Sequence, residues 1–123
     1  MIKVDKKNKI ILEIDDNIFL KILTKDDITS DYINWMNDYD IVKYTNQKNI
    51  KHTFKNVTNF VENKYYSNND YLFGIFNNIN GNKLHIGNIK IGPIDFINNV
   101  SDISYIIGNK NYWGKGIMTK VIK

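Results

Sequence analysis

The sequence contains no cysteine and no arginine, and these two absences exclude several kinds of protein. Without cysteine there is no disulfide, no thiolate nucleophile and no cysteine-ligated zinc, which agrees with a reducing compartment. All 17 basic residues are lysine, and the formal net charge is +4. The chain therefore lacks arginine, the side chain that binds guanine and phosphate in a bidentate manner. The basic charge therefore does not predict specific nucleic-acid binding, and codon usage that favours lysine, asparagine and isoleucine also explains it.

Long apolar runs are missing as well. No segment approaches the roughly 18 apolar residues of a membrane-spanning helix, and residues 1–9 are too polar for a signal peptide. We therefore expect a cytoplasmic protein without a membrane partner. The two histidines, His52 and His85, lie far apart in the sequence and give no metal-binding pattern, so no metal is expected.

The residues that are present are typical of one folded domain. Apolar residues make up 42% of the 123 residues and charged residues 24%, which are ordinary values for a globular protein. A domain of this length buries roughly two-thirds of its unfolded surface. We therefore interpret residues 1–123 as a single domain with enough apolar side chains for a core.

Apolar periodicity predicts that strands come first and helices follow. Residues 1–14 fit two short strands around a polar turn, and residues 18–23 fit a further strand. Residues 26–38 have apolar side chains near helical spacing after a capping-box-like Thr24. A short helix around residues 40–44 is expected to continue this one.

The second half of the chain predicts one more helix and then antiparallel strands. Thr53 is expected to cap a helix whose apolar residues share one face. Three strand patterns follow that helix, at residues 71–76, 83–91 and 101–107. The pair Asn80-Gly81 is a hairpin turn signal, and Pro93 is expected to mark the exit from the hairpin. A helix is then expected from Gly114, which gives an α+β order of elements.

A glycine-containing segment joins the last predicted strand to this helix and carries the clearest chemical signal. Its residues are Trp113, Gly114, Lys115, Gly116, Ile117, Met118 and Thr119. Glycine lets backbone N–H groups approach an anion closely, and the first turn of a helix offers unpaired donors and a partial positive charge. Lys115 and Thr119 would add a cation and a hydroxyl. The segment therefore predicts a phosphate-binding loop.

Two common phosphate motifs fit this segment poorly. A Walker A loop needs four residues between its glycines and a serine or threonine after its lysine. Here five residues separate Gly108 from Gly114, and Gly116 follows Lys115. A dinucleotide-binding fingerprint matches Gly114 and Gly116, but Thr119 stands where its third glycine belongs. An ordinary strand-to-helix connection remains an alternative on these residues alone.

The segment resembles the pyrophosphate loop of the GNAT-type acyl-coenzyme A N-acyltransferases. Their pattern of Arg or Gln, two residues, Gly, one residue and then Gly or Ala falls on Trp113, Gly116 and Met118, and only Gly116 matches it strictly. The order Tyr-Trp-Gly-Lys-Gly-Ile in residues 112–117 is similar to the branch of ribosomal-protein and amino-sugar acetyltransferases. Three more segments resemble that branch: residues 32–37, 86–91 and 102–108.

The resemblance implies a GNAT-like α+β fold, with a mixed and mostly antiparallel sheet flanked by helices. It implies acetyl transfer from acetyl-CoA to a primary amine of an amino sugar, another small molecule or a protein N-terminus. The pantetheine arm would run along Tyr105, Ile106 and Ile107, and the pyrophosphate would lie on the N–H groups of residues 114–119. Asp102 and Tyr105 are candidate acid or base groups, although a capping aspartate and a half-buried tyrosine also explain them.

Other residues with possible roles have simpler structural interpretations. His85 in the predicted hairpin fits a packed strand residue better than a catalytic base. Trp35, Tyr39 and Tyr44 are aromatics at helical spacing, which favours the core over an acceptor pocket.

The family's C-terminal strands and helix have no counterpart in this chain, so we expect the N-terminal portion of such a domain. This leaves an alternative in which the chain is a non-catalytic fragment that binds or oligomerises through its incomplete sheet edge. A small RNA-binding domain is a third hypothesis. It would depend on Tyr71, Phe73 and Lys90, and we expect no specific nucleic-acid partner.

Overall fold

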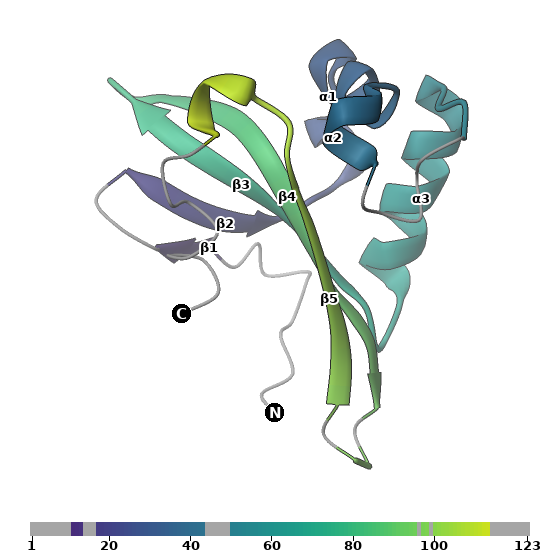
Figure 1. The fold of residues 1–123 in the computed structure, drawn as a ribbon. Helices are drawn as coiled ribbons and strands as arrows, with labels where there is room; N and C mark the ends of the chain where they lie inside the picture. The colour runs from purple at the N-terminus through teal and green to yellow at the C-terminus, as the bar shows by residue number, and fades with distance from the viewer. Residues whose placement is uncertain (1–10, 14–16, 44–49, 96, 99, 114–123) are drawn as a thin grey trace.

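The computed structural model describes residues 11–13, 17–43, 50–95, 97–98 and 100–113 (Figure 1). In this part of the chain one antiparallel sheet carries the helices together on one side. The main elements are β1 (Ile11–Glu13), β2 (Ile18–Ile22), α1 (Ser30–Met36), α2 (Tyr39–Val42), α3 (Phe54–Tyr66), β3 (Tyr71–Ile79), β4 (Asn82–Asp95) and β5 (Val100–Ile107). Short 3-10 helices lie at Lys25–Asp27 and Lys110–Tyr112.

The five strands follow one another in chain order across the sheet, β1-β2-β3-β4-β5, and each pair is antiparallel. The strands predicted at residues 18–23, 71–76, 83–91 and 101–107 are all present. Of the two strands predicted in residues 1–14, the second is described as β1, and the first lies outside the described residues. The α+β fold class is therefore confirmed, and β5 is the last strand of the described sheet.

Side chains alternate between the two faces of the sheet, as strand geometry requires, and two apolar clusters result. One cluster joins the helices to the sheet and includes Tyr32, Trp35, Val61 and Phe76. The second lies on strand residues of the opposite parity, such as Ile75, which is fully buried. Burial of the helical face against the sheet fixes where α1 lies relative to β4 and β5.

The hairpin between β3 and β4 forms at the predicted turn. Asn80 has a φ of 49° and Gly81 a φ of 86°, which is the left-handed pair that a tight hairpin turn requires. The expectation for Pro93 was wrong, because β4 continues through it to Asp95. Pro93 lies where the register between β4 and β5 shifts, between Ile91 and Ile94, and such an irregularity tolerates a residue without an N–H donor.

The helix predicted over residues 26–38 is interrupted. Thr24 does form a capping box with Asp27, but the 3-10 helix it starts ends after three residues. Thr29 then has extended dihedrals, and its side chain accepts a hydrogen bond from the Tyr32 N–H at 3.2 Å, which starts α1 separately. Two competing caps five residues apart divide the helix. The helix after Thr53 forms as predicted, with a capping box between Thr53 and Asn56.

Candidate functional site

The open side of β5 presents backbone groups that no other described strand pairs. Gly108 donates its N–H to the Ile86 carbonyl at 2.9 Å, so Gly108 faces β4. In an antiparallel ladder the residues that face a given neighbour alternate. Ile106 therefore also faces β4, while the N–H and C=O of Tyr105 and Ile107 point to the side away from it.

One of these outward groups has a partner from the turn that follows the strand. The Trp113 indole Nε1 donates to the Ile107 carbonyl at 2.7 Å. The Lys110 ammonium lies 5.6 Å from the centroid of the Trp113 ring. Lys110 also pairs with Asp38 at 2.9 Å and with Asp40 at 3.9 Å, which ties the turn to the junction of α1 and α2.

These charges shift one another's proton affinities. The hydrogen bond from Lys110 holds the pKa of Asp38 below its usual range, and the same bond raises the pKa of Lys110. Lys110 is exposed and Asp38 is partly exposed, so salt will screen their attraction and its contribution to stability is small. The pair nevertheless keeps Asp38 ionised, and it draws the turn after β5 toward the helices.

A cleft of about 380 Å³ lies between α1 and α2 on one side and the end of β5 with its following turn on the other. Its wall is mostly polar and carries Asp31 and Asp38 against Lys110. The lining residues are Asp31, Asn34, Trp35, Asp38, Ile41, Leu84, His85, Gly108, Asn109, Lys110 and Asn111. A cleft with this excess of carboxylates favours a cationic group such as an ammonium.

Close packing of Gly108 against Trp35 forms part of this cleft. A Cβ atom built on Gly108 would lie 1.9 Å from Trp35 Cδ2, far inside van der Waals contact. The Trp35 ring in turn packs edge-to-face on His85, with a centroid distance of 4.9 Å. His85 stacks on Phe76 on its other side at 4.8 Å. The imidazole is thus held among aromatic rings and borders the cleft.

A polar network behind the cleft fixes this imidazole. His85 Nε2 and Asn88 Oδ1 are 2.6 Å apart, and Asn88 also hydrogen-bonds the buried Tyr32 hydroxyl. Burial lowers the pKa of His85 below 6.5, so the ring is neutral at physiological pH. Burial also raises the pKa of the Tyr32 hydroxyl, which therefore stays protonated. The network supplies position and hydrogen bonds without adding charge.

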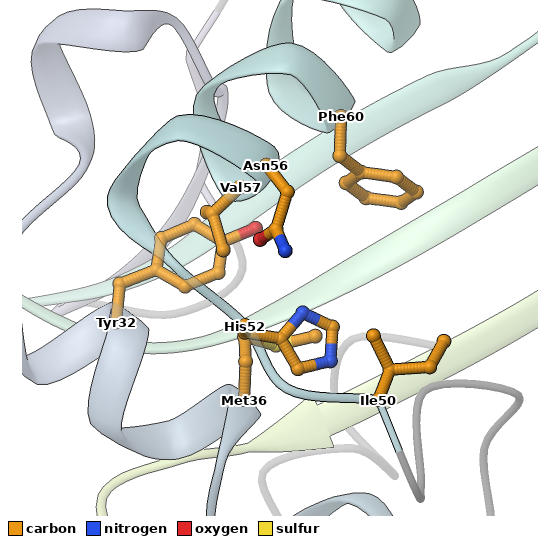
Figure 2. Close-up of a pocket in the computed structure, with 7 residues that line it drawn as sticks. All are labelled: Tyr32, Met36, Ile50, His52, Asn56, Val57 and Phe60. Carbon is orange, nitrogen blue, oxygen red and sulfur yellow. The ribbon is translucent and has the colours of Figure 1, made fainter.

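A second cavity of about 170 Å³ lies on the other side of α1, between this helix and α3 (Figure 2). Its lining residues are Tyr32, Met36, Ile50, His52, Asn56, Val57 and Phe60. Asn37 holds the segment before α3, because its side chain accepts a hydrogen bond from the His52 N–H and donates one to the His52 carbonyl, both at 2.8 Å. This cavity is smaller and mostly apolar, and its lining residues come from α1, α3 and the segment before α3.

The structure places only part of the predicted site. Tyr105, Ile106 and Ile107 lie at the end of β5, and the Trp113 indole lies on the Ile107 carbonyl. That these residues bind a cofactor stays a prediction. The backbone of Asp102 lies in β5, where the register with β4 shifts. The predicted loop residues Gly114, Lys115, Gly116, Ile117, Met118 and Thr119 lie outside the described residues.

Several cleft residues were not selected from the sequence. His85 and Trp35 do pack as interpreted, yet both also line the cleft. Asp38 and Lys110 are 72 positions apart, so no local pattern could pair them. The spacing of His85 and Asn88 across a strand irregularity could have been noticed, because polar residues in an apolar strand need partners.

The described residues contain no group of three or more histidine, aspartate or glutamate side chains arranged to hold a metal ion. No helix in the described ranges has the length and apolar character needed to cross a membrane.

The antiparallel sheet with helices on one side and a cleft beside its last described strand is an α+β fold, and sequence comparison identifies the family. The model of the acetyltransferase (GNAT) domain family matches residues 17–123. The chain therefore belongs to the GNAT acetyltransferase family. No curated protein sequence matches it significantly.

Solved structures of acetyltransferases share the fold at low sequence identity. The microcin C7 self-immunity acetyltransferase MccE, in complex with acetyl-CoA and AMP, superposes with a TM-score of 0.73 at 20% identity, covering 89% of this chain and 60% of that one. A variant of the spermidine N-acetyltransferase SpeG from Vibrio cholerae gives 0.65 at 19% identity, covering 88% and 59%. An acetyltransferase from Salmonella typhimurium that modifies the N-terminal serine of ribosomal protein L7/L12 gives 0.67 at 12%, covering 92% and 63%. The chain thus spans about 60% of the length of these structures.

Proposed function

We propose that this chain forms the acetyl-CoA-binding portion of an N-acetyltransferase that acts on a primary amine. The observation that carries the proposal is the outward-facing backbone of Tyr105 and Ile107, on an edge of β5 that no other described strand pairs, next to a cleft. Membership of the GNAT family and the complex of MccE with acetyl-CoA support it. A cytoplasmic location is part of the same proposal.

The residues present fit a pantetheine arm. Pantetheine is an extended chain with two amide groups, so it can pair with a strand edge in the way that another strand does. The outward N–H and C=O of Tyr105 and the N–H of Ile107 offer donors and an acceptor at strand spacing. The side chain of Tyr105 is 49% exposed beside them and can cover such a chain. Residues 114–119 are proposed to bind the pyrophosphate.

The cleft is the proposed binding site of the acceptor amine. Acetyl-CoA supplies an activated acetyl thioester when bound, and the cleft supplies the position from which an amine reaches it. Asp31 attracts the cationic form of the amine, because Asp38 is already paired with Lys110. Asp102 and Tyr105, the candidate acid or base groups, are not among the residues that line this cleft. We prefer this cleft to the cavity of Figure 2, because no described residue of β5 is among the residues that line that cavity.

The related structures suggest the range of acceptors. Their acceptors include a small polyamine, spermidine, and a protein N-terminal serine. A cleft of about 380 Å³ accommodates a small amine or the first residues of a peptide. We therefore propose a small-molecule or peptide amine as the partner of this chain, and no nucleic acid.

A second candidate function is self-association without catalysis. It is favoured by Ile103 and Tyr105, which are 54% and 49% exposed on β5, whose outer edge pairs with no other described strand. An exposed apolar edge strand is a template for pairing with another copy. Sedimentation of the purified chain, together with a titration with acetyl-CoA, separates the two proposals. A monomer that binds acetyl-CoA supports the first, and an oligomer that does not bind it supports the second.

Isothermal titration of the chain with acetyl-CoA tests the proposed function. We expect saturable heat at micromolar to high-micromolar ligand, and competition by coenzyme A itself. A folded chain that gives no heat up to that concentration would contradict the proposal. Once binding is established, release of free thiol in the presence of spermidine or a serine-initiated peptide would report transfer to each class of amine.

A further inference from the structure

Trp113 occupies the last of the outward carbonyls of β5, that of Ile107. Its indole Nε1 lies 2.7 Å from the Ile107 oxygen, which is a short and therefore well-formed hydrogen bond. The bond blocks the carbonyl of Ile107, the last outward residue of β5, from pairing with another chain or ligand. The N–H and C=O of Tyr105 keep no partner in the described part of the chain.

This arrangement conflicts with complete pairing along the edge. An extended chain that pairs with an antiparallel strand uses both the N–H and the C=O of each outward residue. A partner that follows β5 to its end therefore meets the Trp113 ring at the Ile107 carbonyl. Either the partner stops at Tyr105, or the indole moves away.

In the described part of the chain, few contacts hold the indole in this position. Trp113 is 45% exposed, and it follows the short 3-10 helix without packing into either apolar cluster. Among the residues that the structure describes, its ring has one charged neighbour, Lys110, which is itself exposed and held by Asp38. A single hydrogen bond and one cation–π contact are each worth little at an exposed site. Moving the ring is therefore inexpensive compared with the pairing it would allow.

We infer that Trp113 acts as a latch on the outer edge of β5, where the pantetheine arm of acetyl-CoA is proposed to bind. Its indole leaves the Ile107 carbonyl when the arm pairs with Tyr105 and Ile107. The inference rests on the proposed function. The indole protects the Ile107 carbonyl before binding and gives it up to an amide N–H of the arm. Lys110 and Asp38 connect this movement to the acceptor cleft, because they line it and contact the ring or its cation.

The two tryptophan indole N–H groups of the chain provide a direct readout in a ¹H–¹⁵N spectrum. Trp113→Phe removes one of the two signals and so assigns it, while keeping a ring of similar size. We expect coenzyme A to move the Trp113 signal toward the position of an unbonded indole, with saturation. Adenosine 3′,5′-bisphosphate, which has the nucleotide but no pantetheine arm, should leave that signal in its bonded position.

Affinity provides the second readout. Trp113→Phe lacks the indole donor that must be displaced, so it should bind coenzyme A about two- to tenfold more tightly in titration calorimetry. Lys83→Gln, which changes an exposed lysine on β4 that does not line the cleft, is the control and should bind like the original chain.

The outcomes separate the latch from the function beneath it. An original chain that gives no heat with coenzyme A would overturn both. Heat accompanied by an unmoved Trp113 signal would overturn the latch alone, and so would weaker binding by Trp113→Phe. An equal shift with adenosine 3′,5′-bisphosphate would also contradict it, because the pantetheine arm would then not be the cause.

Discussion

Substitution of Gly108 by alanine should destabilise the chain through a steric clash with Trp35. The added Cβ would lie 1.9 Å from Trp35 Cδ2 and 2.4 Å from two further indole atoms. Carbon atoms pack at about 3.5–4.0 Å, so the ring or the strand end must move by roughly 2 Å. Trp35 is 91% buried and already packs on His85 and Tyr32, which leaves little room for that movement.

Overpacking a filled site costs about 1–3 kcal/mol, and a clash with a fused ring lies at the upper end of that range. With a urea m-value of about 1–3 kcal/mol/M, the unfolding midpoint should fall by about 1 M. Cleft geometry should change too, so acetyl-CoA-dependent thiol release should decrease more than the midpoint alone suggests.

Gly81→Ala is the matched control for this prediction. No atom lies within 4 Å of a Cβ at Gly81, and its φ of +86° makes the cost one of backbone strain alone, about 1 kcal/mol. It lies in the β3–β4 turn, away from the cleft. If Gly108→Ala unfolds at the same urea concentration as Gly81→Ala or higher, the packing argument is refuted.

Three further substitutions test the polar contacts. Asn88→Leu leaves Tyr32 and His85 without their shared partner and should lower the free energy of unfolding in urea by about 2–3 kcal/mol. A smaller loss would mean that water replaces the amide. His85→Gln should make stability less dependent on pH between about 7.5 and 5.5. The pKa of His85 is lowered in the folded chain, so the unfolded chain binds more protons, and the original chain loses stability as pH falls below about 6.5. Parallel curves of unfolding free energy against pH for the two proteins would contradict this. Asn37→Ala removes both hydrogen bonds to His52 and should cost about 1–3 kcal/mol, whereas exposed Asn34→Ala should change little.

Local sequence rules predicted the elements whose signals come from neighbouring residues. The hairpin followed from Asn80-Gly81, and α3 followed from Thr53 and its apolar face, because turn and cap chemistry act over a few residues. The break before α1 was missed because Thr29 and Thr24 offer competing caps, and periodicity does not rank them.

The candidate site was only partly predictable for the same reason. The order of residues located the end of β5, and the alternation of a strand then determines which backbone groups point outward. The cleft depends on contacts between distant segments, such as Asp38 with Lys110 and Trp35 with Gly108. These contacts form only when the sheet has placed α1 beside β5, so no spacing in the sequence predicts them.

The direct test of the central claim is coenzyme A binding by a Tyr105→Pro variant. Proline removes the outward N–H of Tyr105, and an edge strand tolerates proline where its N–H does not face a neighbour. Tyr105→Ala keeps the N–H but loses the ring, and it serves as the control. We predict that Tyr105→Pro stays folded and loses calorimetric binding by at least tenfold relative to Tyr105→Ala. Equal affinity in the two folded variants would contradict pairing of the carrier with this strand edge.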